Sequence, residues 1–206
     1  RARDETMLHQ GIHLPITQRV EVFECSCCPP NLLRTIASIA DFAFSQDDRE
    51  LYVHHYMPCE AQTRFGTLTM ETGYPYDGKI ALTVGFDSEV TIGLRIPGWA
   101  EGAHAEVAGE RLEGTPGQYL RLERVWCDGD EIELTLPMQV RTEKWHHQTL
   151  AVYRGPVLFA LPVPAKWEYK GEMPLCDRWA EPQGPWNYAL VPEEGFAVEG
   201  GGARIA

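Results

Sequence analysis

The chain has 206 residues, and 18 Lys and Arg against 30 Asp and Glu give it a formal net charge of −12. Hydrophobic residues make up 44% and charged residues 23%, which excludes wholesale disorder and supplies enough apolar side chain for a packed core. The acidic balance, with no basic stripe, argues against nucleic acid as a partner, and no apolar run reaches the roughly 20 residues of a membrane-spanning helix.

The two ends of the chain indicate whether it is part of a longer protein, and its cysteines indicate the redox state of its compartment. The chain starts at Arg1 without a signal-like segment and stops in a Gly-rich tail, so we expect a part of a longer protein. Six Cys are too few for a disulfide scaffold, and Cys25, Cys27 and Cys28 are too close together to pair comfortably with one another. This composition favours a reducing, cytoplasmic location.

One helix is predicted, over residues 31–44. Leu32, Ile36 and Ile39 repeat at spacings of three and four residues, which gives one apolar helix face. Pro29 and Pro30 fit just before a helix or in its first turn, and Asn31 is a good capping residue.

From Glu50 onward, short alternating runs rich in Val, Ile, Thr and Tyr are separated by turn residues every eight to twelve positions. Such spacing without interleaved helices predicts an antiparallel β-sandwich. The expected strands are 51–56, 67–72, 79–85, 90–96, 105–107, 119–122 and 131–136. After Pro137, segments 150–153 and 157–161 predict a second β unit, and 162–191 reads as loop-rich with several Trp.

The sharpest motif is Glu-Cys-Ser-Cys-Cys-Pro-Pro-Asn, residues 24–31, directly before the helix. Partial positive charge at a helix N-terminus favours thiolates at Cys27 and Cys28, and a soft cation such as Zn²⁺ would relieve the repulsion between them. The alternative is that these cysteines are small buried hydrophobic residues with inert thiols. The residues alone leave both interpretations open, because Glu24, Cys25 and the His residues show no usual ligand spacing.

The run from Arg19 to Asn31, continued by Arg34 and Ile36, resembles the zinc-dependent β-L-arabinofuranosidases of glycoside hydrolase family 127. Further segments follow in the family's order, so that the resemblance extends from about Gln18 to Leu190. They are Tyr-Pro-Tyr-Asp-Gly (74–78), Leu-Arg-Ile-Pro-Gly-Trp (94–99), Arg-Gly-Pro (154–156) and Trp-Asn-Tyr (186–188).

The resemblance implies a catalytic (α/α)6 barrel followed by β-sandwich domains. It implies that Cys27 is the nucleophile of a retaining mechanism with a thioglycosyl intermediate, that Cys27 and Cys28 are zinc ligands, and that a separate Glu is the acid. In the family the other two ligands come from an upstream Glu-x-Cys element, which is missing before Cys27 here. We therefore expect half of the zinc ligand set, and a chain that is inactive by itself.

The resulting division is 1–46 as the end of the helical barrel, 47–140 as a β-sandwich and 141–206 as a second, incomplete β unit. The expected function is part of a retaining hydrolase that removes β-L-arabinofuranosyl residues from plant-derived glycans or glycoproteins. The alternative is a non-catalytic β-sandwich module for carbohydrate binding or dimer contacts, and a stand-alone thiol or metal protein is a third reading. Expected partners are a carbohydrate substrate and a second copy through a β-sandwich, without nucleic acid or membrane.

Other chemistry-bearing residues have simpler explanations. His54 and His55 fall on opposite faces if the strand extends through them, which favours surface or core roles over metal binding. Trp99 follows a strand-ending Pro-Gly and is expected to pack over the end of the sandwich. Asp128 and Asp130 form an acidic turn that could hold Ca²⁺, although an exposed hairpin turn is the simpler reading.

Overall fold

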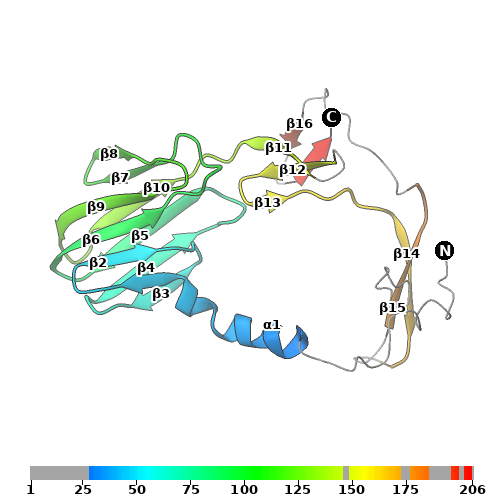
Figure 1. The fold of residues 1–206 in the computed structure, drawn as a ribbon, viewed down its shortest axis with the longest axis horizontal. Coiled ribbons are helices and arrows are strands. Elements are labelled where there is room, and N and C mark those ends of the chain that lie inside the picture. The colour runs from blue at the N-terminus through cyan, green and yellow to red at the C-terminus, as the bar shows by residue number, and fades with distance from the viewer. Residues whose placement is uncertain (1–27, 146–148, 173–176, 186–195, 200–201, 206) are drawn as a thin grey trace. The chain divides into compact units, whose positions relative to one another are not determined.

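A computed structural model describes residues 28–145, 149–172, 177–185, 196–199 and 202–205. The chain divides into two compact units, Arg1–Phe42 and Ala43–Ala206. The described part of the first unit is helical, and that of the second unit is built from strands (Figure 1).

The first unit contains helix α1 (Cys28–Ala37) and a 3₁₀ turn, η2 (Ile39–Phe42). The predicted helix therefore begins three residues earlier, because Pro29 and Pro30 occupy the first turn, where backbone N–H groups have no helical partner. It also ends earlier, because η2 takes over the last turn, with Asp41 N–H donating to the Ser38 carbonyl. Leu32, Leu33 and Ile36 are each more than half exposed, so the apolar face of α1 is not covered in the described structure.

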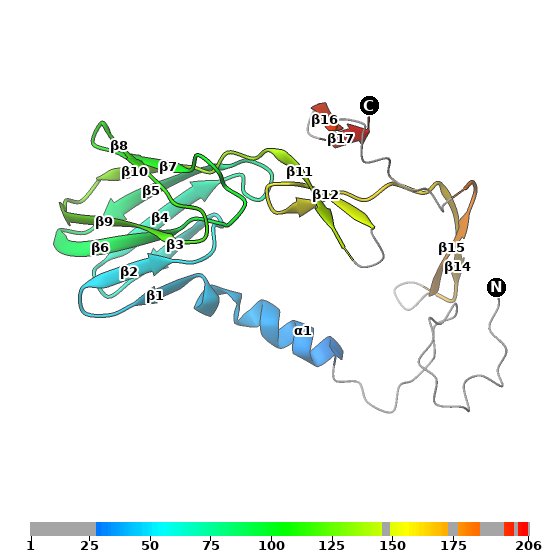
Figure 2. The ribbon, with the colours of Figure 1, turned by 45° about the horizontal axis from the view of Figure 1, so that its top comes forward.

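Two sheets form a β-sandwich in the second unit (Figures 1 and 2). Sheet A has the order β1-β2-β6-β9, and sheet B has the order β3-β4-β5-β10-β7-β8. The strands of sheet A are β1 (Phe44–Gln46), β2 (Glu50–Val53), β6 (Ser88–Arg95) and β9 (Tyr119–Trp126). Those of sheet B are β3 (Cys59–Gln62), β4 (Thr67–Thr72), β5 (Lys79–Gly85), β10 (Glu131–Thr135), β7 (His104–Val107) and β8 (Glu110–Glu113).

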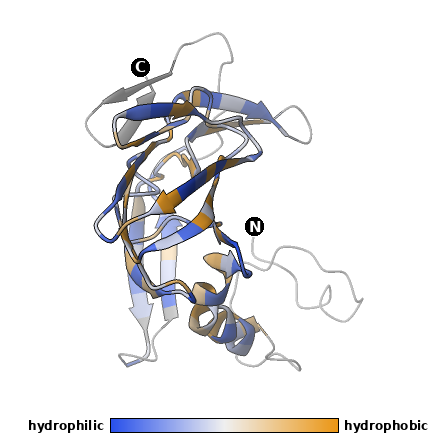
Figure 3. Ribbon diagram, turned by 90° about the vertical axis from the view of Figure 1, so that its left-hand side faces the viewer, coloured by the Kyte–Doolittle hydropathy of each residue, from blue (hydrophilic) through white to orange (hydrophobic). Residues whose placement is uncertain are grey.

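Alternation along the strands builds one apolar core between these sheets. In β5 every second residue is buried, and the same period of two runs through β2, β7 and β10. Figure 3 shows hydrophobic and hydrophilic residues alternating along the strands of the sandwich. Trp126 is fully buried, and its indole N–H donates to the Val90 carbonyl at 2.8 Å, which satisfies its polar atom. The predicted β-sandwich is thus confirmed.

The strand pairs of the sandwich are antiparallel except for one. β2 and β6 run parallel, with Tyr52 opposite Gly93 and Val53 opposite Leu94. A parallel pair needs a crossover, and here the chain crosses through β3, β4 and β5 of sheet B before it returns as β6.

Most predicted strands are present with small shifts. β4 and β5 match their predicted bounds, whereas β9 continues four residues further, to Trp126, and β2 already ends at Val53. Short strands β1, β3 and β8 were not predicted, since three or four residues carry too little periodicity.

Three smaller sheets follow the sandwich in sequence. The first contains β11 (Val140–Lys144), β12 (Leu150–Arg154) and β13 (Val157–Leu158). The others are hairpins of β14 (Ala165–Lys170) with β15 (Asp177–Pro182), and of β16 (Phe196–Glu199) with β17 (Gly202–Ile205). The prediction of a loop-rich segment at 162–191 is wrong for β14 and β15, where charged and aromatic residues alternate from Lys166 to Lys170.

One row of register partners across sheet A determines where the Tyr52 side chain lies. Tyr52 on β2, Gly93 on β6 and Arg121 on β9 are register partners across three neighbouring strands. A Cβ added at Gly93 would overlap the Tyr52 ring, so that ring lies across β6 only because residue 93 has no side chain.

Gly93→Ala is expected to destabilise the protein by about 1–3 kcal/mol, because the new methyl group must displace the Tyr52 ring. Gly98→Ala is the matched control, since no heavy atom lies within 4 Å of its Cβ position and it does not have a left-handed backbone. Urea unfolding followed by Trp fluorescence measures both variants, and equal stabilities would contradict this account.

The β7–β8 hairpin turns at Ala108 and Gly109, both with positive φ, of 50° and 79°. Since such a turn prefers Asn-Gly, Ala108→Asn should raise the free energy of unfolding by about 0.5–1 kcal/mol, and Gly109→Ala should lower it by a similar amount. Thermal unfolding measures the midpoint temperature of each variant, which should rise for Ala108→Asn and fall for Gly109→Ala. Midpoints that shift in the same direction in both variants would refute this account of the turn.

Candidate functional sites

The described residues begin inside the cysteine motif. Cys27 lies outside the described residues, whereas Cys28 is the first residue of α1 and is exposed. Among the described residues, no three His, Cys, Asp or Glu side chains come together in a way that could hold a metal ion. Within the described ranges, Cys28 is thus the one residue of the motif whose thiol could serve as a zinc ligand, and no complete set of ligands is present there.

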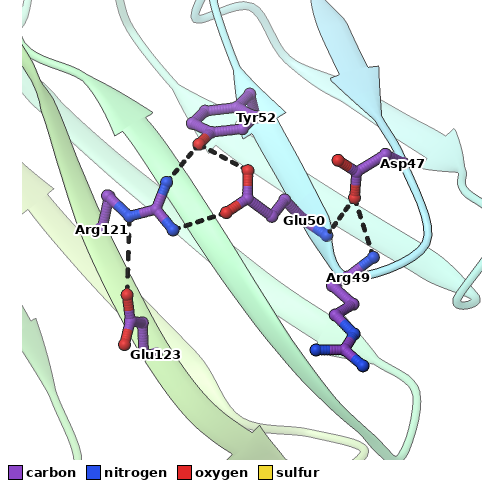
Figure 4. Close-up of polar contacts among 6 residues, drawn as sticks. All are labelled: Asp47, Arg49, Glu50, Tyr52, Arg121 and Glu123. Carbon is purple, nitrogen blue, oxygen red and sulfur yellow. Dashed lines mark hydrogen bonds and ion pairs between the residues drawn. The ribbon is translucent and has the colours of Figure 1, made fainter.

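A second group of functional side chains lies on the outer face of sheet A. The two carboxylate oxygens of Glu50 accept separate bonds, one from the Tyr52 hydroxyl at 2.8 Å and one from Arg121 at 2.5 Å. Arg121 also donates to the Tyr52 hydroxyl and lies 3.6 Å from Glu123. Figure 4 shows these side chains converging from β2 and β9. The bonds to Arg121 and Tyr52 lower the pKa of the Glu50 carboxyl.

The β1–β2 turn is fixed by the neighbouring carboxylate of Asp47. Its Oδ1 accepts from the backbone N–H groups of Arg49 and Glu50, at 2.8 and 2.9 Å (Figure 4). These backbone bonds, foremost that of Arg49, lower the pKa of Asp47. The turn thus holds Glu50 at the start of β2, where it meets Arg121.

His54 continues this surface at the end of β2. Its two ring nitrogens lie 2.6 Å from the Tyr119 hydroxyl and 2.7 Å from the Ser45 hydroxyl. Desolvation lowers the pKa of His54, and the charges of His55 and Arg95 add to this effect. Hydroxyl groups therefore occupy both ring nitrogens of His54, and the strand expected to run through His54 and His55 ends before them, at Val53.

Arg95 lies beside His54 on β6. Its Nε donates to the His54 carbonyl at 2.6 Å, while its own carbonyl accepts from the buried Tyr56 hydroxyl at 2.7 Å. Burial raises the pKa of Tyr56, and likewise that of Tyr74, whose ring meets Tyr56 edge-on. The Arg95 side chain is therefore tied to the backbone at the end of β2 through its Nε.

The remaining candidates fit the simpler readings. Trp99 is partly buried and packs against the core of the sandwich. Asp130 accepts from the Cys127 backbone N–H at 2.9 Å, which makes the acidic segment an ordinary hairpin turn. His146 and His147 lie outside the described residues. Trp167 and Trp179 are exposed on the β14–β15 hairpin.

No helix in the described ranges has both the length and the apolar character to cross a membrane.

Sequence reasoning did not identify the group around Tyr52. Its members come from β2, β6 and β9, which are far apart in sequence, and the parallel pairing of β2 with β6 is not visible in a periodicity. Two features of the sequence could have indicated this group: Gly93 within a strand pattern, and an outward Tyr on each of two other strands, Tyr52 and Tyr119.

Replacing Glu50 by Gln should lower stability at pH 7, because the ionised carboxylate holds Tyr52 and Arg121. The pKa of Glu50 is depressed in the folded state, so its contribution is fully present above the ordinary Glu pKa and is lost as the pH falls through the folded value. The difference in urea unfolding between wild type and Glu50→Gln should be full at pH 7 and should shrink as the pH falls below the ordinary Glu pKa. A difference that does not shrink as the pH falls would contradict this origin.

Comparison with known proteins gives a consistent relationship. A family model described as β-L-arabinofuranosidase, GH127 middle domain, matches residues 50–138. The non-reducing end β-L-arabinofuranosidase of Bifidobacterium longum is 28% identical over 210 residues, covering 94% of this chain and 29% of that protein.

Solved structures agree. The GH127 β-L-arabinofuranosidase from Geobacillus stearothermophilus T6 is 33% identical with a TM-score of 0.60, over 91% of this chain and 34% of that one. Another GH127 β-arabinofuranosidase is 26% identical with a TM-score of 0.59, over 76% of this chain and 32% of that one. This chain thus spans about a third of the length of its relatives, and its residues 50–138 match the middle domain of glycoside hydrolase family 127.

Proposed function

We propose that this chain forms part of a retaining β-L-arabinofuranosidase in which Cys27 is the nucleophile, and in which Cys27 and Cys28 are ligands of a zinc ion. The substrates are β-L-arabinofuranosides of plant-derived glycans or glycoproteins. The observation that carries the proposal is the exposed Cys28 at the first residue of α1, directly after Cys27, in a chain that matches this family's middle domain.

The position of the motif supports its chemistry. Backbone N–H groups in the first turn of a helix have no helical acceptor, and they favour negative charge in their neighbourhood. Pro29 and Pro30 hold the first turn of α1 directly after the two cysteines. Cys28 therefore lies in the first turn of α1, at the end of the helix that favours negative charge.

Zinc, when bound, would keep the adjacent thiols ionised at neutral pH. The Cys27 thiolate then attacks the anomeric carbon of the arabinofuranosyl group, the glycosidic C–O bond breaks, and an acid protonates the departing oxygen. Water subsequently cleaves the thioglycosyl bond and releases arabinose with retained configuration. Neither the acid nor the further zinc ligands is assigned to a residue of this chain.

Zinc should protect both cysteines from alkylation. The 206-residue chain, reduced and then treated with iodoacetamide with or without excess Zn²⁺, is analysed by peptide mass spectrometry. Alkylation of Cys27 and Cys28 is expected to slow by about tenfold with zinc, because a metal-bound thiolate shares its electrons with the ion and reacts slowly with a reagent that no binding site positions for attack.

Cys127 is the matched control, since it is exposed and lies on the turn after β9, outside the cysteine motif. Its alkylation rate should be unchanged by zinc. A Cys27→Ser plus Cys28→Ser variant should lose the bound zinc, whereas Cys127→Ser should keep it. Equal alkylation of Cys27 with and without zinc would refute the metal assignment.

Hydrolysis is expected to need residues beyond this chain. Incubation of the 206-residue chain with an aryl β-L-arabinofuranoside should therefore release no aryl alcohol above the rate of the Cys27→Ser variant. Turnover by the chain that disappears in Cys27→Ser would establish the nucleophile and would contradict the need for further residues.

A further inference from the structure

We infer that the outer face of sheet A is an accessory saccharide-binding surface, formed by the rings of Tyr52, His54 and Tyr119 with the guanidinium of Arg95 at its margin. It binds a neutral sugar without cleaving it. Its residues lie on or directly after β2, β6 and β9 and include none of the cysteine motif, and only the class of sugar, an L-arabinofuranoside, rests on the proposed function.

The two outer faces of the same sandwich differ in composition. None of the six described strands of sheet B contains Phe, Tyr or Trp. Its outward residues are of the kind found on an ordinary solvent-facing sheet, such as Thr83, Ala81 and Glu133. Sheet A instead presents Tyr52 and Tyr119 outward. A grouped aromatic surface on one face and not on the other indicates a contact site.

The rings of this surface are held in place before any ligand arrives. The Tyr52 and His54 rings are nearly parallel, with an interplanar angle of 3° and centroids 6.3 Å apart. Tyr119 meets them edge-on, at 5.1 and 5.6 Å. The Tyr52 hydroxyl donates to Glu50, and the His54 ring is hydrogen-bonded to the Ser45 hydroxyl, so both rings are fixed. Little side-chain entropy is then lost when a sugar binds.

Arg95 supplies unused donors beside these rings. Its Nε is bonded to the His54 carbonyl, whereas its two terminal nitrogens make no hydrogen bond or ion pair with any residue that the structure describes. Tyr119 is the register partner of Arg95 on β9. A planar pair of N–H donors next to an aromatic ring can bond two neighbouring hydroxyl groups while the ring contacts the C–H face of the same sugar.

The charge balance favours a neutral ligand. Arg121 and Arg95 are matched on this face by Glu50 and Glu123, although the chain as a whole is strongly acidic. An anionic ligand would meet no net positive charge on this face. An apolar protein surface would have to remove these charged groups from water, which is costly. A polyhydroxylated ring with one apolar face fits both the hydrogen-bonding groups and the aromatic rings.

The test is a ¹H–¹⁵N NMR titration of the 206-residue chain with methyl β-L-arabinofuranoside, up to about 50 mM because single-sugar contacts are weak. Saturable shifts are expected on β2, β6 and β9, without shifts on β5 and β10. Absence of shifts, or shifts on sheet B instead, would overturn the inference. The hydrolysis assay above is independent, so failure of the nucleophile assignment leaves this result interpretable.

Variants identify the side chains. Tyr119→Ala should raise the dissociation constant about fivefold through loss of the ring, and Tyr119→Phe should keep most of the affinity. Tyr76→Ala is the matched control, because Tyr76 is 73% exposed but lies outside sheet A. An equal loss in Tyr76→Ala, or no change in Tyr119→Ala, would overturn the assignment. If Tyr119→Ala fails to fold, Arg95→Lys provides the same test, with an expected loss of about threefold.

Discussion

The parallel pairing of β2 with β6 is the constraint on which the sandwich depends. These strands are separated in sequence by β3, β4 and β5, all in the other sheet, so the pairing ties the two sheets into one structure. The pairing also places Tyr52 beside Gly93 and, through β9, in line with Arg121. The core and the aromatic outer face are therefore consequences of the same crossover.

The outer face illustrates how a missing side chain organises its neighbours. With any residue larger than Gly at position 93, Tyr52 would have to leave its place across β6. Its hydroxyl would then lose Arg121, and Glu50 would keep only one of its two partners. Like a buried polar network, such a group of mutually dependent bonds confers a single geometry more than it confers stability.

The sequence predicted which face of each strand is buried better than it predicted which strands pair with one another. Alternation in Lys79–Gly85 and Thr67–Thr72 was sufficient to predict both strands at their observed bounds, because each buries every second or nearly every second residue. The register between β2 and β6 was not predictable, since burial of one face does not say which strand lies alongside. The helix begins three residues before its predicted start, because the prolines fill its first turn and Asn31, the expected capping residue, lies inside it.

The candidate sites show the same division. Cys28 was recognised from a contiguous motif, and its place at the start of α1 follows from the prolines that come next. The surface around Tyr52 comes from three strands and contains no motif, so it became visible only with the register.

The apolar face of helix α1, which is exposed in the described part of the chain, has a consequence for the colloidal behaviour of the protein. Leu32, Leu33 and Ile36 leave much of their surface in water, at a cost of about 25 cal/mol for each Å². Helices with such a face associate with one another or with chaperones as concentration rises. The net charge of −12 opposes this association by mutual repulsion, and salt weakens that repulsion. Low ionic strength is therefore the condition in which the chain stays dispersed.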